Sequence, residues 1–409
     1  MSRILALTLF LLSVSHPSYL CSQEPLAGSW NCQLDCPGGA LKFGLIIEQQ
    51  PNEKSLRAYL TNGSEKISIP SVEQTDQTTE LRIDHYDSSV AFKQRGTVLQ
   101  GRWKKRRGED KWVEMKFSGT KKQGNDSPTS DSVEITWATG KWLVDFEKSD
   151  DPAVAIFRSE KNGTASGTFL TTTGDYRFLH GTANQKTIEL SCFDGAHAFL
   201  FRAELNDAGK LEGDFWSSDT WHEKWTAIRK DDATLPDAFK QTTLVGQHPL
   251  ENFKFPDMNG EPTSLVDSQF AAKARLIYVF GSWCPNCHDA AAYFKKLQEK
   301  YGSDLSILGL AFEHTGDFER DSAQVSKYLK RHQVSYPVLL AGLSDKQLAG
   351  KSIPFLDRVR SYPTTIFLNG ENNQVQEIHT GFTGPATGKA YLQMTEKFER
   401  IIDGIIAEK

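Results

Sequence analysis

The stretch Leu276-Ile277-Tyr278-Val279-Phe280-Gly281-Ser282-Trp283-Cys284-Pro285-Asn286-Cys287 decides the fold of the last part of this 409-residue chain. It opens with five apolar residues in a row, a pattern typical of a buried parallel strand. Beyond Cys287, apolar residues recur at the spacing of an amphipathic helix. A Cys-x-x-Cys pair therefore stands at the point where a buried strand is followed by a helix.

The two cysteines of this pair have different expected roles. The first turn of a helix offers unpaired N–H groups and the positive end of the helix dipole, which favour a thiolate at Cys284. We expect Cys284 to attack a disulfide and Cys287, one turn further on, to resolve the mixed disulfide. Pro285 suits the first helical turn, and Trp283 precedes the pair. Because the redox-active disulfide Cys284–Cys287 is itself the working group, no metal or organic cofactor is expected.

Further segments complete a strand and helix pattern around this pair. The predicted elements are strands at residues 276–280, 305–310, 365–368 and 375–378, and helices from residue 287, around 325–329 and over about 389–406. This order predicts a mixed α/β sheet. Just before the third strand, Tyr362-Pro363-Thr364 contains a candidate cis proline. Pro363 and its neighbours would hold a substrate chain by backbone hydrogen bonds beside Cys284.

The N-terminal half reads as a duplicated β domain, because short sequence matches recur in order at an offset of roughly 110 residues. The matching pairs are Gly28-Ser29-Trp30 with Gly140-Lys141-Trp142, Leu60-Thr61 with Leu170-Thr171, Tyr86-Asp87 with Phe193-Asp194, Leu99-Gln100-Gly101 with Leu211-Glu212-Gly213, and Trp112 with Trp225. Alternating apolar residues and turns such as Asn62-Gly63 predict two tandem antiparallel barrels or sandwiches.

These patterns divide the chain into five parts. They are a signal peptide at residues 1–22, a first β domain at 23–120, a second at 131–230 that repeats the first, a linker at 231–244 and a redox domain at 245–409. Recurring tryptophans either fill the barrel cores or line a ligand pocket in each barrel. These tryptophans are Trp30, Trp103, Trp112, Trp142, Trp216 and Trp225.

The first residues predict export. Arg3 is followed by an apolar run at residues 4–14, which is shorter than the roughly 20 residues that span a bilayer. We expect a periplasmic or secreted protein with no transmembrane span after cleavage near Ser22, and a lipid anchor at Cys21 is the alternative. The net charge of -5 argues against general binding of nucleic acids.

Six cysteines occur in the chain, and export would place them where disulfides persist. Removal of Cys21 with the signal leaves an odd number, so at least one thiol has no partner within the chain. Cys32 and Cys36 would lie roughly 13 Å apart on a straight strand and can bridge only if the chain turns back. The pairing of these two and of Cys192 stays open.

The residues from about 245 onward resemble the thioredoxin-like superfamily, and within it the exported thiol–disulfide oxidoreductases of the TlpA/ResA type. The matching segments are Phe253-Lys254-Phe255-Pro256-Asp257-Met258-Asn259-Gly260, the Trp283-Cys284-Pro285-Asn286-Cys287 motif, Tyr336-Pro337-Val338-Leu339 and Tyr362-Pro363-Thr364-Thr365. The resemblance implies reversible dithiol–disulfide exchange with other proteins, often as a reductase outside the cytoplasm. Its partners would be protein dithiols or disulfides and an upstream electron donor.

Two positions depart from the resemblance. Tyr278 stands where thioredoxin has a buried acid, and Ala290 stands where related exported reductases often have one. Proton transfer from Cys287 therefore needs another route. Glu313, just past the second predicted strand, is the candidate, and the alternative is a solvated acid at a strand end.

Three other interpretations of the same sequence remain as alternatives. Cys284-Pro285-Asn286-Cys287-His288 is also the attachment pattern of a c-type haem. A peroxide-reducing redoxin would share much of the fold. Finally, the β half could be the functional ligand- or partner-binding module, with the redox domain as an accessory.

Overall fold

The computed structural model describes residues 24–50, 55–75, 77–123, 136–160, 162–246 and 249–408. The predicted signal peptide and Cys21 lie outside these residues. Within the described ranges, no helix combines the length and apolar character that crossing a bilayer requires.

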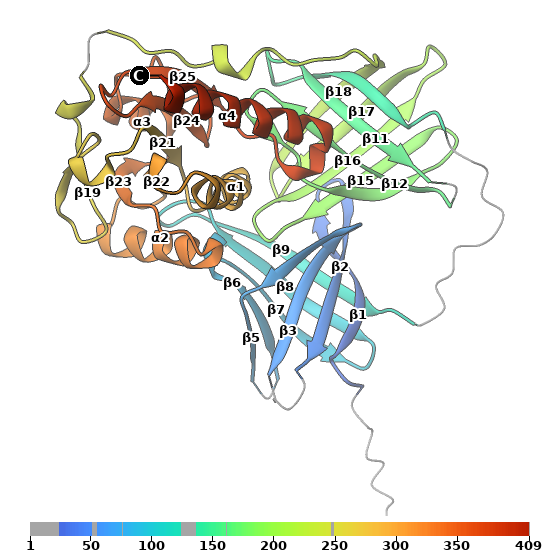
Figure 1. Cartoon of the computed structure of the whole chain (residues 1–409). Coiled ribbons are helices and arrows are strands. Elements are labelled where there is room, and N and C mark those ends of the chain that lie inside the picture. Colours follow the sequence, from blue (N-terminus) through green and yellow to red (C-terminus); the bar gives the residue numbers. More distant parts are fainter. Residues whose placement is uncertain are drawn as a thin grey trace, which may run out of the picture.

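The first nine strands form one antiparallel sheet that curls into a nearly closed barrel (Figure 1). The strands are β1 (Gly28–Cys36), β2 (Gly39–Gln49), β3 (Leu56–Asn62), β4 (Glu65–Ile69), β5 (Ser71–Gln74), β6 (Thr79–Ile83), β7 (Ser88–Arg95), β8 (Val98–Arg106) and β9 (Trp112–Lys121). Their order across the sheet is β4-β3-β2-β1-β9-β8-β7-β6-β5. Buried and exposed residues alternate along β1, as expected for a strand with one face on a core.

A second nine-stranded sheet forms a closed barrel, because β11 pairs with both β10 and β12. Its strands are β10 (Gly140–Phe146), β11 (Ala153–Ser159), β12 (Thr164–Thr171), β13 (Gly174–Asp175), β14 (Leu179–Ala183), β15 (Thr187–Phe193), β16 (Ala198–Leu205), β17 (Lys210–Ser217) and β18 (Trp221–Arg229). The order β11-β10-β18-β17-β16-β15 matches β2-β1-β9-β8-β7-β6 of the first barrel. The fold class predicted for this half, two tandem antiparallel β barrels, is therefore confirmed.

The two barrels also begin in the same way. Gly28 and Gly140 open β1 and β10 with φ of +136° and +133°, a conformation that side chains rarely adopt. Two residues later, the indole N–H groups of Trp30 and Trp142 donate to the carbonyl four residues earlier, at 3.0 and 3.2 Å. The recurrence of Gly-x-Trp thus marks the same strand start in both barrels.

One of the sequence matches is wrong. Trp112 begins β9 and is 52% exposed, whereas Trp225 is buried within β18. The residue that begins β18 is Trp221, which is 43% exposed. Of the six recurring tryptophans, four are buried in the barrel cores, which supports the core-filling interpretation. These four are Trp30, Trp103, Trp142 and Trp225.

The two barrels share part of their cores. Phe193, at the end of β15, reaches into the first barrel, where its ring centroid lies 4.6 Å from that of Phe43 and 5.3 Å from that of Trp103. The buried side-chain amide of Asn62 donates to the carbonyl of Phe193 (3.1 Å) and accepts from its N–H (3.0 Å). The second barrel therefore completes the interior of the first.

The cysteines of the barrels are buried free thiols. Cys32 and Cys36 lie on the same strand β1, which pairs in continuous register with β2. Because the strand does not turn back between them, the geometry that a bridge would need is absent. Cys192 lies on β15 of the second barrel.

The C-terminal part has a thioredoxin-like fold, as predicted. Its elements are β19 (Lys254–Pro256), β20 (Pro262–Ser264), β21 (Ala274–Phe280), α1 (Pro285–Tyr301), β22 (Leu305–Glu313), α2 (Phe318–His332), β23 (Val338–Leu343), α3 (Lys346–Ser352), β24 (Thr364–Asn369), β25 (Val375–Thr380) and α4 (Lys389–Ala407). The central sheet has the order β23-β22-β21-β24-β25, with β21, β22 and β23 parallel. Strand β23 and helix α3 were not predicted.

Short 3-10 helices lie between strands and helices of the first barrel and of the C-terminal part. They are η1 (Asp84–Tyr86), η2 (Ala238–Lys240), η3 (Leu250–Asn252), η4 (Ser268–Phe270), η5 (Gly302–Asp304) and η6 (Pro385–Thr387). The segment predicted as a linker contains η2, where Phe239 packs against Phe367, His379 and Phe398. This segment is therefore attached to the thioredoxin-like domain.

We predict that Phe193→Ala destabilises both barrels together. The substitution leaves a cavity in the shared core, so the free energy of unfolding should fall by about 3–5 kcal/mol. Urea unfolding followed by tryptophan fluorescence measures this loss. As a control, Trp112→Ala at an exposed strand start should cost less than about 1 kcal/mol. Equal losses in the two variants would contradict a shared core.

Candidate active site

The Cys-x-x-Cys pair lies where β21 is followed by helix α1. Cys284 is the N-cap of α1, and its Sγ accepts a hydrogen bond from the N–H of Cys287 at 3.3 Å. Pro285 occupies the first helical position, as predicted. Cys284 is 6% exposed and Cys287 is fully buried, and both are free thiols. The first cysteine thus lies nearer the surface than the second.

Among the residues that the structure describes, two tyrosines and no carboxylate side chain make hydrogen bonds to Cys287. Burial raises the pKa of the Cys287 thiol well above its usual value, and the neighbouring Cys284 raises it further. The hydroxyl groups of Tyr278 and Tyr328 donate to the carbonyl of Cys287 at 2.7 and 2.9 Å. Tyr278 also acts on the Cys287 thiol by hydrogen bonding, which works to lower that pKa. The position at which thioredoxin has an acid is therefore filled by a buried phenol.

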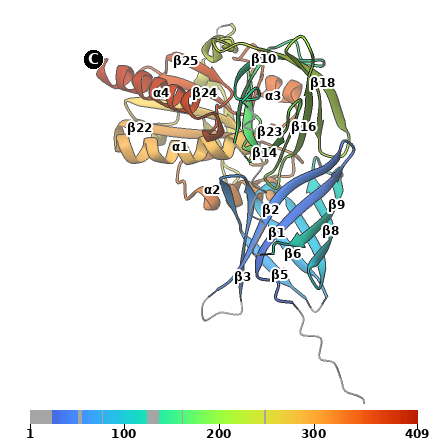
Figure 2. The same ribbon diagram turned by 90° about the vertical axis from the view of Figure 1, so that its right-hand side faces the viewer.

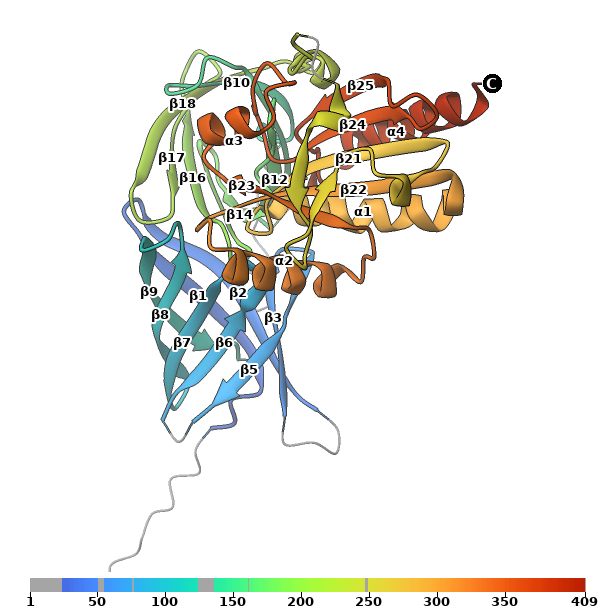
Figure 3. The same cartoon turned by 90° about the vertical axis from the view of Figure 1, so that its left-hand side faces the viewer.

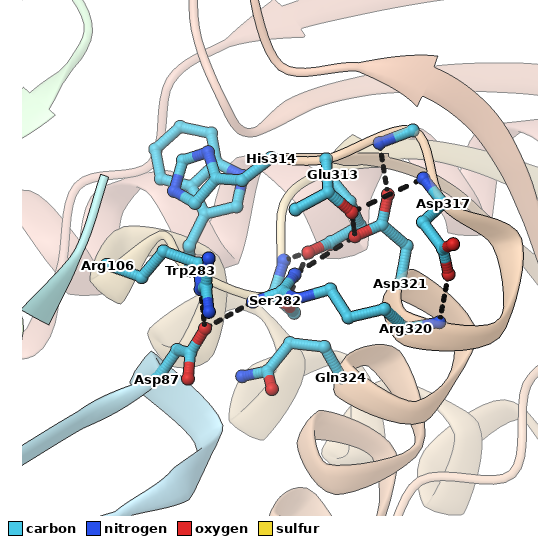
Figure 4. Close-up of polar contacts among 12 residues, drawn as sticks. Asp87, Arg106, Ser282, Trp283, Glu313, His314, Asp317, Arg320, Asp321 and Gln324 are labelled. Carbon is cyan, nitrogen blue, oxygen red and sulfur yellow. Dashed lines mark hydrogen bonds and ion pairs between the residues drawn. The ribbon is translucent and has the colours of Figure 1, made fainter. Parts of the chain in front are cut away.

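Glu313 contacts Ser282, and its hydrogen bonds do not reach Cys287 (Figure 4). Its two carboxyl oxygens accept from the N–H and the Oγ of Ser282 at 2.8 and 2.7 Å. The side chain is buried, with 1% exposed, so the interpretation as a solvated acid is wrong. Burial raises the pKa of the Glu313 carboxyl to about 8, against the hydrogen bonds from Ser282.

His288 holds the same loop from the other side. Because the carbonyl of Ser282 can only accept, Nε2 of His288 donates to it at 2.7 Å. Nδ1 of His288 then accepts from Nε2 of His332 at 2.6 Å. Burial lowers the pKa of His288 well below its usual value, so this ring is neutral. Together, Glu313 and His288 bind the N–H, the Oγ and the carbonyl of Ser282 and thereby fix the loop before Cys284.

The predicted proline loop lies against the first cysteine. The Tyr362–Pro363 peptide bond is cis, as predicted. The thiol of Cys284 donates to the carbonyl of Tyr362 at 3.3 Å, and Thr364 begins β24. The indole of Trp283 packs edge-on against the Tyr362 ring, with the centroids 5.4 Å apart. The structure therefore brings these predicted residues together and leaves Glu313 behind the loop.

The first barrel contributes residues that sequence reasoning missed. In η1, the ring of Tyr86 packs edge-on against His288, with the centroids 4.6 Å apart. Asp87 pairs with Arg320 of α2 and, at 2.8 Å, with Arg106 (Figure 4). Helix α2 thus lies at the rim of the first barrel (Figure 3).

A buried ion cluster joins the second barrel to both neighbours. Arg177 forms an ion pair with Asp289 of α1, and it lies 3.4 Å from both Glu65 of the first barrel and Asp194 of the second. Burial raises the pKa of Glu65 to about 7 and that of Asp289 to about 6. One feature of the sequence pointed to two of these residues, because Asp87 and Asp194 belong to matched pairs of the repeat. Asp87 makes a contact between domains, through Arg320, whereas Asp194 pairs with Arg177 within its own barrel.

We predict that Glu313→Gln flattens the pH dependence of stability. Between about pH 5 and pH 8, folded Glu313 holds a proton that the unfolded chain releases, so the free energy of unfolding falls as pH rises. Glutamine keeps both hydrogen bonds to Ser282 without titrating. At pH 8 the variant should therefore gain up to about 3 kcal/mol over the wild type. The exposed Glu371→Gln is the control, and parallel stability curves for both variants and the wild type would disprove the assignment.

Comparisons with known proteins concern the part of the chain that holds this site. Residues 245–385 match the family model described as Redoxin. No curated protein matches the chain. Similar solved structures include a secreted disulfide oxidoreductase from Mycobacterium tuberculosis, with 12% identity, a TM-score of 0.28, and coverage of 38% of this chain and 96% of that one.

Two further solved structures resemble the same part of the chain. One is a thiol-disulfide oxidoreductase from Bacteroides fragilis, with 21% identity, a TM-score of 0.26, and coverage of 35% of this chain and 96% of that chain. The other is the exposed lipoprotein thioredoxin Etrx1 from Streptococcus pneumoniae, with 22% identity, a TM-score of 0.24, and coverage of 36% and 98%. Residues 245–385 thus match the redoxin family model, and this part of the chain has a thioredoxin-like fold.

Proposed function

We propose that this protein is a thiol–disulfide oxidoreductase that works outside the cytoplasm, as a reductase of protein disulfides, through Cys284 and Cys287. The observation that carries the proposal is the N-cap position of Cys284. A helix N-terminus and a backbone N–H at 3.3 Å both favour a sulfur anion at this place. The apolar segment at residues 4–14 supports the export part of the proposal.

The reaction needs only the two thiols and a substrate disulfide. The Cys284 thiolate attacks one substrate sulfur, the substrate S–S bond breaks, and the released sulfur takes up a proton. Cys287 then loses its proton and attacks Sγ of Cys284, which forms the Cys284–Cys287 disulfide and releases the second substrate thiol. Two electrons and two protons pass to the substrate, and an upstream dithiol donor restores the pair.

The second step requires a thiolate at a fully buried sulfur. The phenol of Tyr278 lies beside Cys287 and works to lower the pKa of its thiol, so we assign to Tyr278 a part in stabilising this anion. Glu313 is then a positioning residue, because it acts on the loop through Ser282. Because the carboxyl oxygens of Glu313 accept hydrogen bonds from Ser282, Glu313 is not assigned as the direct route for the proton of Cys287.

The haem alternative does not fit the donor set. Attachment through this motif needs an imidazole nitrogen of His288 to face the iron. Both ring nitrogens of His288 are engaged, one by the carbonyl of Ser282 and the other by His332. Reduction of small peroxides is the second candidate activity, because a cysteine that is 6% exposed can still meet a small oxidant. Rapid loss of peroxide in a single turnover would establish it.

We predict that 5,5′-dithiobis(2-nitrobenzoate) distinguishes the two cysteines. Reduced wild-type protein should release two thionitrobenzoate ions as the internal disulfide forms. Cys287→Ser should release one and keep the mixed disulfide on Cys284, and Cys284→Ser should react at least about a hundredfold more slowly. Mass spectrometry locates the label, and Cys36→Ser is the control for a buried thiol elsewhere. A Cys284→Ser variant with wild-type release would refute the proposal.

A further inference from the structure

Cys284 is nearly buried although it caps a helix and is assigned to attack other proteins. Figure 2 shows the second barrel beside the redox domain. The segment of that barrel which reaches the redox site is the turn between β12 and β13, residues 171–175, which we call the cover turn. Its contacts with the loops around Cys284 bear on how a large substrate reaches the thiol.

The cover turn contacts the Cys-x-x-Cys loop directly. A Cβ on Gly174 would lie 1.8 Å from Nδ2 of Asn286, the residue before Cys287. The carbonyl of Thr173 accepts a hydrogen bond from Oγ of Ser361 at 2.9 Å, next to the Tyr362–Pro363 loop. Thus the turn touches the two loops that flank the thiol of Cys284.

A third loop of the redox domain also meets the cover turn. A Cβ on Gly381 would lie 2.8 Å from the carbonyl carbon of Thr173. The N–H of Gly384 donates to Asp175 at 2.5 Å. A polypeptide that presents a disulfide to Cys284 has to place its own backbone over these same three loops, because they are the surface around the thiol. The turn and such a substrate therefore compete for one place.

The contact between the cover turn and the redox domain leaves buried polar atoms without hydrogen-bond partners. Within the described part of the chain, Oδ1 of Asn286 is buried without a hydrogen-bond partner, and so is Nε of Arg360. A buried polar atom left unpaired costs free energy, so this contact is weaker than a fully bonded domain interface. The turn is anchored at its edge, where Asp151 pairs with Arg360 and accepts from Oγ1 of Thr172 at 3.0 Å.

We propose that the cover turn occupies the docking site for protein substrates, so that a protein disulfide reaches Cys284 only after the second barrel has moved away from the redox domain. This inference rests on the proposed function and adds regulation to the same site. A small disulfide reaches the thiol without displacing the turn. The ratio of the rate with a protein disulfide to the rate with a small disulfide therefore reports what fraction of molecules has the cover turn moved away.

Reversing the charge of Asp151, at the edge of the cover turn, tests this inference. Asp151→Arg sets two like charges against each other, so the opened form should become more populated and insulin reduction should rise about tenfold. The rate with 5,5′-dithiobis(2-nitrobenzoate) should stay within about twofold of the wild type. Asp207→Arg is the matched control, because Asp207 lies on the same barrel with its side chain 97% exposed.

A charge swap separates opening of the cover from a simple change of surface charge. Arg360→Glu should also speed insulin reduction, and the double variant Asp151→Arg/Arg360→Glu should return it to near the wild-type rate because the ion pair is restored. Labelling of Cys284 by a maleimide on a 5-kDa polyethylene glycol should follow the same order. If insulin reduction and labelling are unchanged in both single variants while the small disulfide reacts normally, the proposed role of the cover turn is contradicted and the proposed function is not. No reaction of Cys284 with either disulfide would overturn the proposed function as well.

Discussion

The side chain of Arg177 is buried among carboxylates that come from all three domains. Glu65 belongs to the first barrel, Asp194 to the second, and Asp289 to the helix that begins at the redox pair. A buried guanidinium has to be paired, since removing it from water without partners would cost several kcal/mol. The placement of the three domains in this structure supplies these partners. The contacts of η1 and of the cover turn with the redox site follow from that placement.

The redox loop depends on a second set of buried contacts, which hold a single serine. Glu313 and His288 bind every polar group of Ser282, and neither side chain needs a charge to do so. In this site the carboxyl group is thus used to position the loop, and a phenol lies beside the resolving thiol. Positioning of the loop and contact with the resolving cysteine are thus divided between different residues.

Much of this structure could be predicted from patterns of local sequence. Strand β21, helix α1 and the strands β24 and β25 follow from apolar periodicity. Strand β23 (Val338–Leu343) was not predicted, although it follows Pro337 just as the predicted β24 follows Pro363. The burial of Glu313 and the partners of His288 arise from distant parts of the chain. His332 lies 44 residues after His288, and no local pattern links two such residues.

The insertion of Phe193 into the first barrel has a consequence for the order in which this chain folds during synthesis. The strands of the first barrel leave the ribosome first, and their core still lacks the ring that lies between Phe43 and Trp103. That ring arrives only with β15, after most of the second barrel has been made. Contacts so distant along the chain form late and slowly. Until β15 is in place, the first barrel therefore lacks part of its apolar packing and keeps its interior open.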